Sequence, residues 1–258
     1  MEEHSLSTYI IVFFIFSFLG YISEVLYCSI GERRFINRGF LKGPIIPIYG
    51  FGGLVILLFL SPLKDLKLGY IYIFLSSMAV ASVIEYIGSW LLERIFKVKL
   101  WDYSSHRFNI KGRVCLKNSM LFGLMGVLMV KYIEGPVYSF VTSFSISTQR
   151  IVSIILLSLF SIDFIFSTIK MNSFRNALSE ISEKAKVLSS KTRSLTSELR
   201  LKLEEEYKAF FDNKHKSFRR LISSFPGATS SFDELRKPIL ELIERERELR
   251  SRLKHDKR

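Results

Sequence analysis

Three carboxylates interrupt the apolar runs of this 258-residue sequence: Glu24, Glu85 and Asp163. An ionisable side chain inside a membrane span is costly to bury, so it is a candidate for a functional role. Grouped together, the three could bind a cation, relay protons or receive basic side chains from neighbouring loops. The alternative is that each points separately toward the lipid headgroups or pairs with a local arginine.

The positions of the carboxylates within their runs favour a cluster. If the first, third and fifth apolar runs cross the membrane in the same direction, each carboxylate lies about six to eight residues before the inner end of its run. At 1.5 Å per residue, that depth is roughly 9–12 Å below the inner surface. Neighbouring helices would then bring the three side chains together, and we expect Glu24→Gln and Glu85→Gln to have similar, non-additive effects.

A second set of candidates enters the second apolar run, where prolines and glycines interrupt the helical pattern. Irregular backbone at membrane depth is tolerated only where protein or a water-filled cavity covers it, and broken helices of this kind line transport sites. The competing interpretation is an interfacial turn with Pro44 near the first turn of a helix. The candidate residues are Gly39, Lys42, Gly43, Pro44, Pro47, Tyr49 and Gly50.

The third set lies in the loop at 93–117 and consists of Trp101, Asp102, Tyr103, Asn109 and Arg113. The two aromatic side chains suit the headgroup layer. The polar ones could form a network beneath the carboxylates, or bind a headgroup phosphate through the arginine. The neighbouring serine and histidine are too close in sequence to Asp102 to indicate a hydrolase. We expect no catalytic residue and no enzyme.

The elements that must position these residues are helices. A membrane core of about 30 Å requires roughly 20 apolar residues, and five runs come close. The sequence therefore predicts an all-α, polytopic membrane helix bundle over residues 1–171. Its spans lie at about 8–30, 44–60, 69–92, 118–133 and 150–171, and the Gly135-Pro136 pair leaves open whether 135–148 is re-entrant or lies on the surface.

Basic residues in the loops predict the orientation, because lysine and arginine translocate poorly. Eleven of them lie in the loops at 31–43 and 93–117, whereas the other two loops hold three or four. These two loops and the tail are therefore expected in the cytoplasm, and the N-terminus on the outer side of the membrane.

The tail at 172–258 is expected to be a cytoplasmic helical arm. Its apolar residues recur at heptad-like spacing, which is typical of one amphipathic helix or of a coiled-coil dimer. Ser231 and Glu234 indicate the capping box of a last helix. The stripe consists of Leu178, Ile181, Ala185, Leu188, Leu195, Leu199 and Leu203.

Several other classes of protein are disfavoured. The net charge of +13 is spread over membrane loops and a tail with interleaved acids, so nucleic acid is an improbable partner. Two cysteines and four dispersed histidines give no metal-ligand spacing, and no phosphate-binding GxxxxGK[ST] motif occurs. We expect no cofactor. The small residues Ser119, Gly123 and Gly126 predict close helix packing.

The same segments resemble a bacterial family of integral membrane proteins, Putative ABC-transporter type IV. The resemblance covers roughly residues 10–170, and Leu100 replaces a tryptophan that is common in the family. It implies a multi-span, permease-like protein of the bacterial inner membrane without a defined substrate. The motifs are GFLKGP at 39–44, PIYG at 47–50, EY at 85–86, WLLE at 90–93, WDYS at 101–104, FNIKGRVCL at 108–116 and GLMG at 123–126.

Three functions are consistent with these features. The first is a transport component whose ATPase comes from another chain, in a homodimer joined through the C-terminal helix. The second is a membrane-anchored scaffold or sensor whose arm binds a partner. The third, a lipid-headgroup enzyme acting through Arg113 and Asp102, lacks a nucleophile–base pair.

Overall fold

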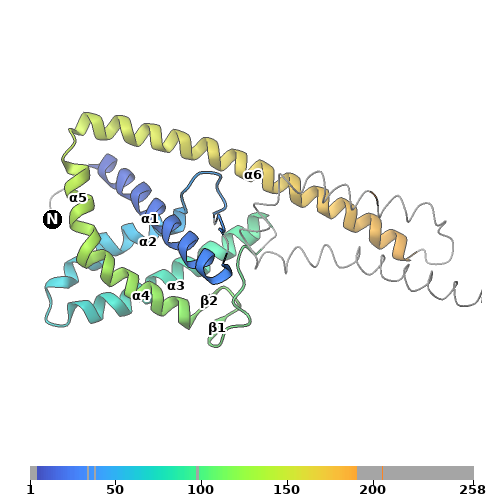
Figure 1. Cartoon of the computed structure of the whole chain (residues 1–258), viewed down its shortest axis with the longest axis horizontal. Coiled ribbons are helices and arrows are strands. Elements are labelled where there is room, and N and C mark those ends of the chain that lie inside the picture. Colours follow the sequence, from blue (N-terminus) through green and yellow to red (C-terminus); the bar gives the residue numbers. More distant parts are fainter. Residues whose placement is uncertain (1–4, 34, 38, 97–98, 191–204, 206–258) are drawn as a thin grey trace, which may run out of the picture.

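The structure is a computed structural model that describes residues 5–33, 35–37, 39–96, 99–190 and 205. It contains five helices long and apolar enough to cross a membrane, which confirms the predicted polytopic helix bundle. The spans alternate in direction, so that α1, α3 and α6 run the same way (Figure 1). The spans are Leu6–Ile30, Pro47–Asp65, Gly69–Phe96, Leu116–Thr142 and Ile146–Ser173.

The first span is the regular helix α1 (Leu6–Glu32), and both of its ends are capped. At its start the Ser5 side chain accepts a hydrogen bond from the Thr8 amide at 3.3 Å. At its end Arg33 adopts a left-handed backbone with φ 52°, and its amide returns to the Ile30 carbonyl. These caps satisfy backbone groups that a helix leaves open at its termini.

The second span begins later than predicted, at Pro47 instead of residue 44, because Pro44 lies in an irregular bend before the helix. Proline is tolerated at the first helical position, where its missing N–H is not needed. The span consists of α2 (Pro47–Val55), a π-helical turn η1 (Ile56–Leu60) and a 3₁₀ turn η2 (Ser61–Asp65).

The fourth span is longer than predicted. It consists of α4 (Leu116–Leu128), a π-helical turn η3 (Met129–Ile133) and α5 (Glu134–Thr142). The helix passes through Gly135 and Pro136, because a proline in the first turn of α5 removes an N–H that has no partner there. The ribbon bends at this π turn (Figure 1). Residues 135–142 thus belong to the span.

Two helix pairs form the body of the bundle, α1 with α2 and α3 (Gly69–Phe96) with α4, and α2 also packs on α3. Small residues permit these contacts. Gly50 lies directly against the Phe13 ring and the Ser17 hydroxyl of α1, and Gly126 lies directly against Ser77 of α3. Close backbone approach at small residues stabilises helix pairs in lipid. The expected role of Gly126 in close packing is therefore what the structure shows.

The last helix, α6 (Ile146–Ser190), packs on α1 and crosses residue 171 without a break. The fifth span and the beginning of the predicted arm are therefore one continuous helix. The first four residues of the heptad-like stripe lie within α6, whereas its last three, Leu195, Leu199 and Leu203, and the capping box at Ser231 and Glu234 lie outside the described residues, so that the predicted coiled coil is not tested.

A short β-hairpin, β1 (Asn109–Ile110) and β2 (Val114–Cys115), precedes α4. We call the end of the bundle that carries it the hairpin end, and the other the opposite end. The loops after α1 and after α3 and the outgoing part of α6 all lie at the hairpin end (Figure 1).

Candidate functional site

The hairpin is closed by a tight turn that its sequence favours. Lys111 and Gly112 have φ values of 53° and 68°, and the Arg113 amide donates to the Ile110 carbonyl at 3.0 Å. Two successive positive φ angles are the mark of a type I′ turn, which matches the twist of a two-stranded hairpin. The Asn109 carboxamide accepts from the Gly112 amide at 2.9 Å and so holds the turn.

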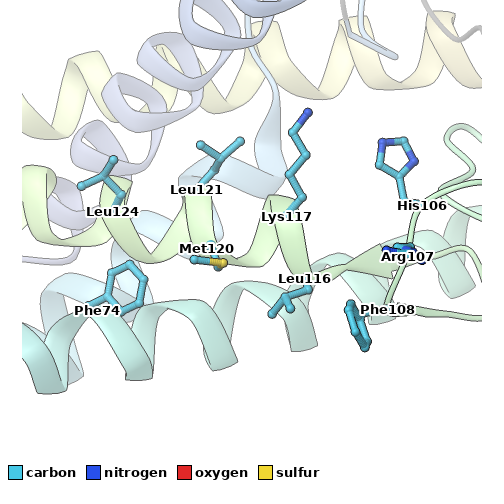
Figure 2. Close-up of a pocket in the computed structure, with 9 residues that line it drawn as sticks. All are labelled: Phe74, His106, Arg107, Phe108, Leu116, Lys117, Met120, Leu121 and Leu124. Atoms are coloured by element: carbon cyan, nitrogen blue, oxygen red, sulfur yellow. The ribbon is translucent and has the colours of Figure 1, made fainter.

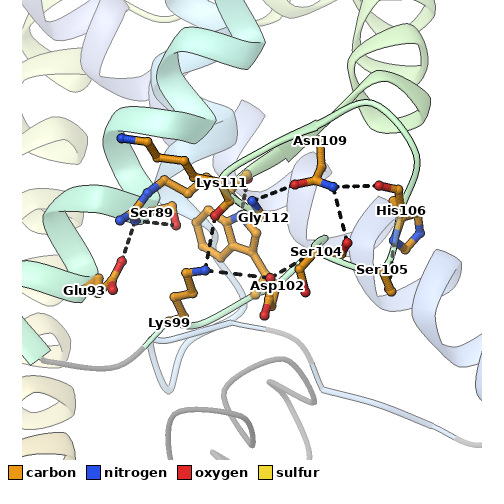
Figure 3. Close-up of polar contacts among 12 residues, drawn as sticks. Ser89, Glu93, Lys99, Asp102, Ser104, Ser105, His106, Asn109, Lys111 and Gly112 are labelled. Atoms are coloured by element: carbon orange, nitrogen blue, oxygen red, sulfur yellow. Dashed lines mark hydrogen bonds and ion pairs between the residues drawn. The ribbon is translucent and has the colours of Figure 1, made fainter.

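The candidate residue Asp102 holds the loop before β1 close to this turn (Figure 3). Its Oδ1 accepts from the Ser104 amide at 3.0 Å and lies 3.8 Å from Lys99 Nζ. Gly112 lies so close to the Asp102 carboxylate that a Cβ atom there would overlap it. The Tyr103 amide donates to the Gly112 carbonyl at 2.8 Å, which aligns the loop with the hairpin.

The candidate Arg113 ties the hairpin to α3. Its guanidinium lies 2.6 Å from the Glu93 carboxylate and donates to the Ser89 hydroxyl at 3.3 Å. The indole of Trp101 donates to the Arg113 carbonyl at 2.9 Å. Arg113 is therefore committed to an ion pair inside the chain, and Trp101 contacts the hairpin as well.

The candidate Tyr103 reaches from this loop to the carboxylate of Glu85 in α3. Its hydroxyl donates to Glu85 Oε1 at 3.1 Å, and the Asn118 side chain of α4 hydrogen-bonds to the same hydroxyl. Burial, and next the negative charge of Glu85, raise the pKa of Tyr103 above its ordinary value of 10.0. The hydroxyl is therefore a proton donor at all ordinary pH values.

A second tyrosine holds the second carboxylate. Tyr49, in the first turn of α2, donates to Glu24 Oε2 of α1 at 2.6 Å. The Cys28 thiol lies 3.7 Å from Glu24 Oε1. Gly20, one helical turn before Glu24, lies directly against the Tyr49 ring. A glycine is required there because any side chain would displace the tyrosine.

The two carboxylate–tyrosine pairs are close enough to interact. The charge of Glu24 acts on Glu85, and the charges of both glutamates act on Tyr49. Only 6% of Glu85 is exposed, and within the described part of the chain its Oε2 atom has no hydrogen-bond partner. Together, α1, α2, α3 and the loop before β1 therefore enclose two acidic groups with tyrosine donors. We call Glu24, Tyr49, Glu85 and Tyr103 the paired-carboxylate site.

The third carboxylate, Asp163 of α6, binds elsewhere. It accepts hydrogen bonds from the backbone amides of Lys42 at 3.0 Å and Gly43 at 2.7 Å, and from the Ser167 hydroxyl at 3.1 Å. Two consecutive amides directed at one carboxylate form a compact anion-binding turn. Asp163 therefore fastens the segment before α2 to the last helix.

That segment is irregular up to Ile46 and is partly covered by protein, with Lys42 and Pro44 exposed. Leu41 is 1% exposed, and the Phe40 ring packs on Phe96 of α3 with centroids 4.9 Å apart. The Ile46 amide donates to the Ser17 carbonyl of α1 at 3.0 Å. Such partners are what irregular backbone needs at membrane depth. Of the candidates in this segment, Tyr49 lies in the paired-carboxylate site, and Gly50 packs against α1.

A fourth carboxylate was missed by the sequence reasoning, because the predicted fourth span ended one residue before it. Glu134 begins α5 at the opposite end, accepts from the Ser61 hydroxyl at 2.6 Å and lies 3.8 Å from Lys64 Nζ. The signal was present: a glutamate directly follows the apolar run, and a proline two residues later is compatible with a first helical turn.

The arrangement does not form a metal site of the usual kind. Within the described ranges, no three His, Cys, Asp or Glu side chains gather closely enough to hold a metal ion. What the paired-carboxylate site offers is two carboxylates, each with a tyrosine hydroxyl donor.

Comparison with known proteins assigns the family. A family model described as Putative ABC-transporter type IV matches residues 11–168, which include the three middle spans, most of the first and the fifth, and every member of the paired-carboxylate site. No curated protein and no solved structure gives a match to the chain. Since the match extends over more than half of the sequence, the chain belongs to the Putative ABC-transporter type IV family of membrane proteins.

Proposed function

We propose that this protein is the membrane-spanning subunit of a transporter in the bacterial inner membrane, with ATP hydrolysis supplied by another polypeptide. Its hairpin end faces the cytoplasm and its N-terminus faces outward, as the distribution of basic residues favours. The ATPase docks on the loops of the hairpin end and on the arm. The family assignment supports the transport role, and the gathering of both basic loops and the outgoing α6 at one end supports this orientation.

The observation that carries the proposal is the paired-carboxylate site. An acidic group that is taken out of water is costly unless a partner stabilises it. Here two carboxylates share one enclosed place, and Glu85 keeps one oxygen without a hydrogen bond among the described residues. The site therefore suits a cation or a cationic group of a substrate, which enters between α1, α2 and α3.

A cysteine-accessibility experiment tests this proposal. The two native cysteines, Cys28 and Cys115, are both buried and are replaced by alanine. Glu85→Cys is then treated with a cationic, water-soluble methanethiosulfonate reagent. Because only a hydrated thiol ionises and reacts, we expect modification within minutes.

Ser77→Cys is the matched control. Ser77 is fully buried on the same helix, eight residues before Glu85 and so about 12 Å away along the axis. We expect this position to stay unmodified, with both variants eluting as folded protein. Equal inertness at positions 85 and 77 would show that no aqueous path reaches the carboxylates and would remove the basis of the transport proposal.

A membrane-anchored scaffold is the second candidate, and the continuity of α6 favours it. A single helix of 45 residues, from Ile146 to Ser190, would connect the membrane span to the beginning of the arm without a hinge. In that role the chain would lose its partner when truncated after Ser190, whereas Glu85→Gln would leave partner capture and cellular phenotype unchanged. A transporter predicts that Glu85→Gln alone abolishes function.

A further inference from the structure

A groove on the outer face of α4 has a composition that the transport proposal does not use. Its volume is about 700 Å³, and it lies between α4, the start of α3 and the loop before β1. Figure 2 shows Phe74 and Leu124 at one end and the residues 106–108 at the other. The lining residues are Phe74, His106, Arg107, Phe108, Leu116, Lys117, Met120, Leu121 and Leu124.

The apolar part of the groove faces outward from the bundle. Met120 is 51% exposed and Leu124 50% exposed, although both lie on a membrane-spanning helix. Exposed apolar side chains on such a helix are covered by lipid chains. From Lys117 to Leu124 the groove extends seven residues along α4, or about 10 Å, which admits the first part of an acyl chain.

The end of the groove nearest the hairpin is basic. Lys117, Arg107 and His106 are all exposed there, and in the part of the chain that the structure describes neither Lys117 nor Arg107 forms an ion pair. Of the other basic residues of the hairpin region, Arg113 pairs with Glu93 and Lys99 with Asp102, whereas Lys111 is exposed in the turn of the hairpin, outside the groove. Lys117 and Arg107 therefore bring two unpaired positive charges to the same end of the groove.

The loop beside the basic end of the groove carries exposed apolar side chains that suit the boundary of the membrane. Phe108, with φ 54°, is 78% exposed beside the basic cluster, and Ile110 of β1 is 59% exposed. An exposed aromatic beside cationic side chains is the usual composition of the headgroup layer. The sequence assigned this interfacial role to Trp101 and Tyr103, which the structure instead directs toward the hairpin and Glu85.

We infer that the groove binds an anionic phospholipid. Its phosphate lies between Lys117 and Arg107 with His106 nearby, and one acyl chain follows Met120 toward Leu124 and Phe74. The assignment rests on chemical complementarity. The unpaired positive charges match the phosphate of such a lipid, and the apolar groove on a membrane-spanning helix matches its acyl chain. A site for a soluble anion would not need the channel, and generic lipid contact would not need the cluster.

Native mass spectrometry of the full chain in detergent tests the inference. Phosphatidylglycerol is titrated as the probe, with phosphatidylcholine and glycerol phosphate as comparison ligands. We expect retained phosphatidylglycerol adducts, few phosphatidylcholine adducts and none with glycerol phosphate. Retention of glycerol phosphate alone would assign the cluster to a soluble anion, and equal retention of both lipids would show non-specific contact; either result overturns the inference.

Two matched pairs of variants locate the site. Lys117→Gln should weaken phosphatidylglycerol binding about fivefold, as expected for one basic residue at an anionic surface. Arg94→Gln removes the same charge from another exposed position at the hairpin end and should change nothing. Met120→Trp fills the groove and should also weaken binding, whereas Met125→Trp, at another exposed position of α4 that lies outside the groove, should not. Equal losses within either pair would contradict the site.

Discussion

The two carboxylates of the paired-carboxylate site are each held by one tyrosine hydroxyl, and this pairing makes their burial tolerable. Tyr49 donates to Glu24 at 2.6 Å and Tyr103 donates to Glu85 at 3.1 Å. Hydrogen bonds to a charged acceptor are stronger than neutral ones. The two acids still repel each other, and in the proposed function a cation relieves that repulsion.

The repulsion predicts the behaviour of the glutamine variants. Glu24→Gln and Glu85→Gln retain an acceptor for each tyrosine but remove one negative charge. At pH 8 each should raise the apparent Tm in detergent by about 2–4 °C, the shift expected for about 1 kcal/mol. Because both relieve the same repulsion, the double variant should gain little more than either single one. Fully additive shifts would show that the two acids are independent.

The raised pKa of Tyr103 predicts an alkaline loss of stability. The hydroxyl stays protonated in the folded chain, whereas in the unfolded chain it ionises near its ordinary value of 10.0. The stabilisation is therefore complete below pH 10 and declines as the pH rises above it.

Tyr103→Phe tests that sign. At pH 8 the variant should unfold about 3–12 °C lower, because Glu85 loses a hydrogen bond to a charged acceptor worth about 1.5–3 kcal/mol. Between pH 10 and 11 the difference should shrink, since only the wild type loses stability through this hydroxyl. Apparent Tm values measured from pH 8 to 11 provide the check, and a constant difference over that range would contradict it.

The segments and helices around the site are fixed by contacts that the sequence revealed only in part. Five spans and the irregular stretch before α2 followed from apolar runs and from proline and glycine. The partners of Asp163 could not be predicted. The two amides that bind it lie about 120 residues earlier, and a sequence does not show which backbone amides are free to donate. The contact between Tyr103 and Glu85 was not predicted either, because aromatic side chains in loops usually lie in the headgroup layer of the membrane.

The Asp163 contact predicts a change in protease sensitivity. Asp163→Ala removes both acceptors of the Lys42–Gly43 turn, so that the segment opens more often. Trypsin should then cleave after Lys42 about five- to tenfold faster, as expected when about 1–1.4 kcal/mol of local stability is lost. Ser161→Ala, which removes a hydroxyl of the same helix that bonds to the Leu157 carbonyl and not to Asp163, should cleave at the wild-type rate. The fragment ending at Lys42 is quantified by mass spectrometry, and unchanged cleavage in Asp163→Ala would refute the anchoring role.

Helix packing predicts a contrast between two glycines of α2. A Cβ at Gly50 would overlap Ser17 and the Phe13 ring, whereas a Cβ at Gly52 would meet nothing within 4 Å. Gly50→Ala should therefore destabilise the bundle by about 1–3 kcal/mol. Gly52→Ala should be neutral or slightly stabilising. Thermal unfolding of both variants in one detergent checks this, and equal Tm values would mean that α1 and α2 are not closely packed.

At the scale of the whole chain, part of the positive charge behind the net +13 lies in the loops of the hairpin end. The basic loops and the outgoing α6 gather at the hairpin end, where Arg113 and Lys99 brace the fold and Lys117 and Arg107 border the groove. The sequence predicted that the loops share a side. It could not show which lysines and arginines are paired, because ion pairing depends on the tertiary contacts of each side chain.

The central claim is that this protein works with a separate ATPase, and purification from native membranes in mild detergent tests it most directly. A tagged chain should recover a nucleotide-binding subunit together with ATP hydrolysis. Glu85→Gln should recover the same subunit, because the carboxylate is buried away from any docking surface. Repeated recovery of a complex without an ATPase and without ATP hydrolysis would contradict the account.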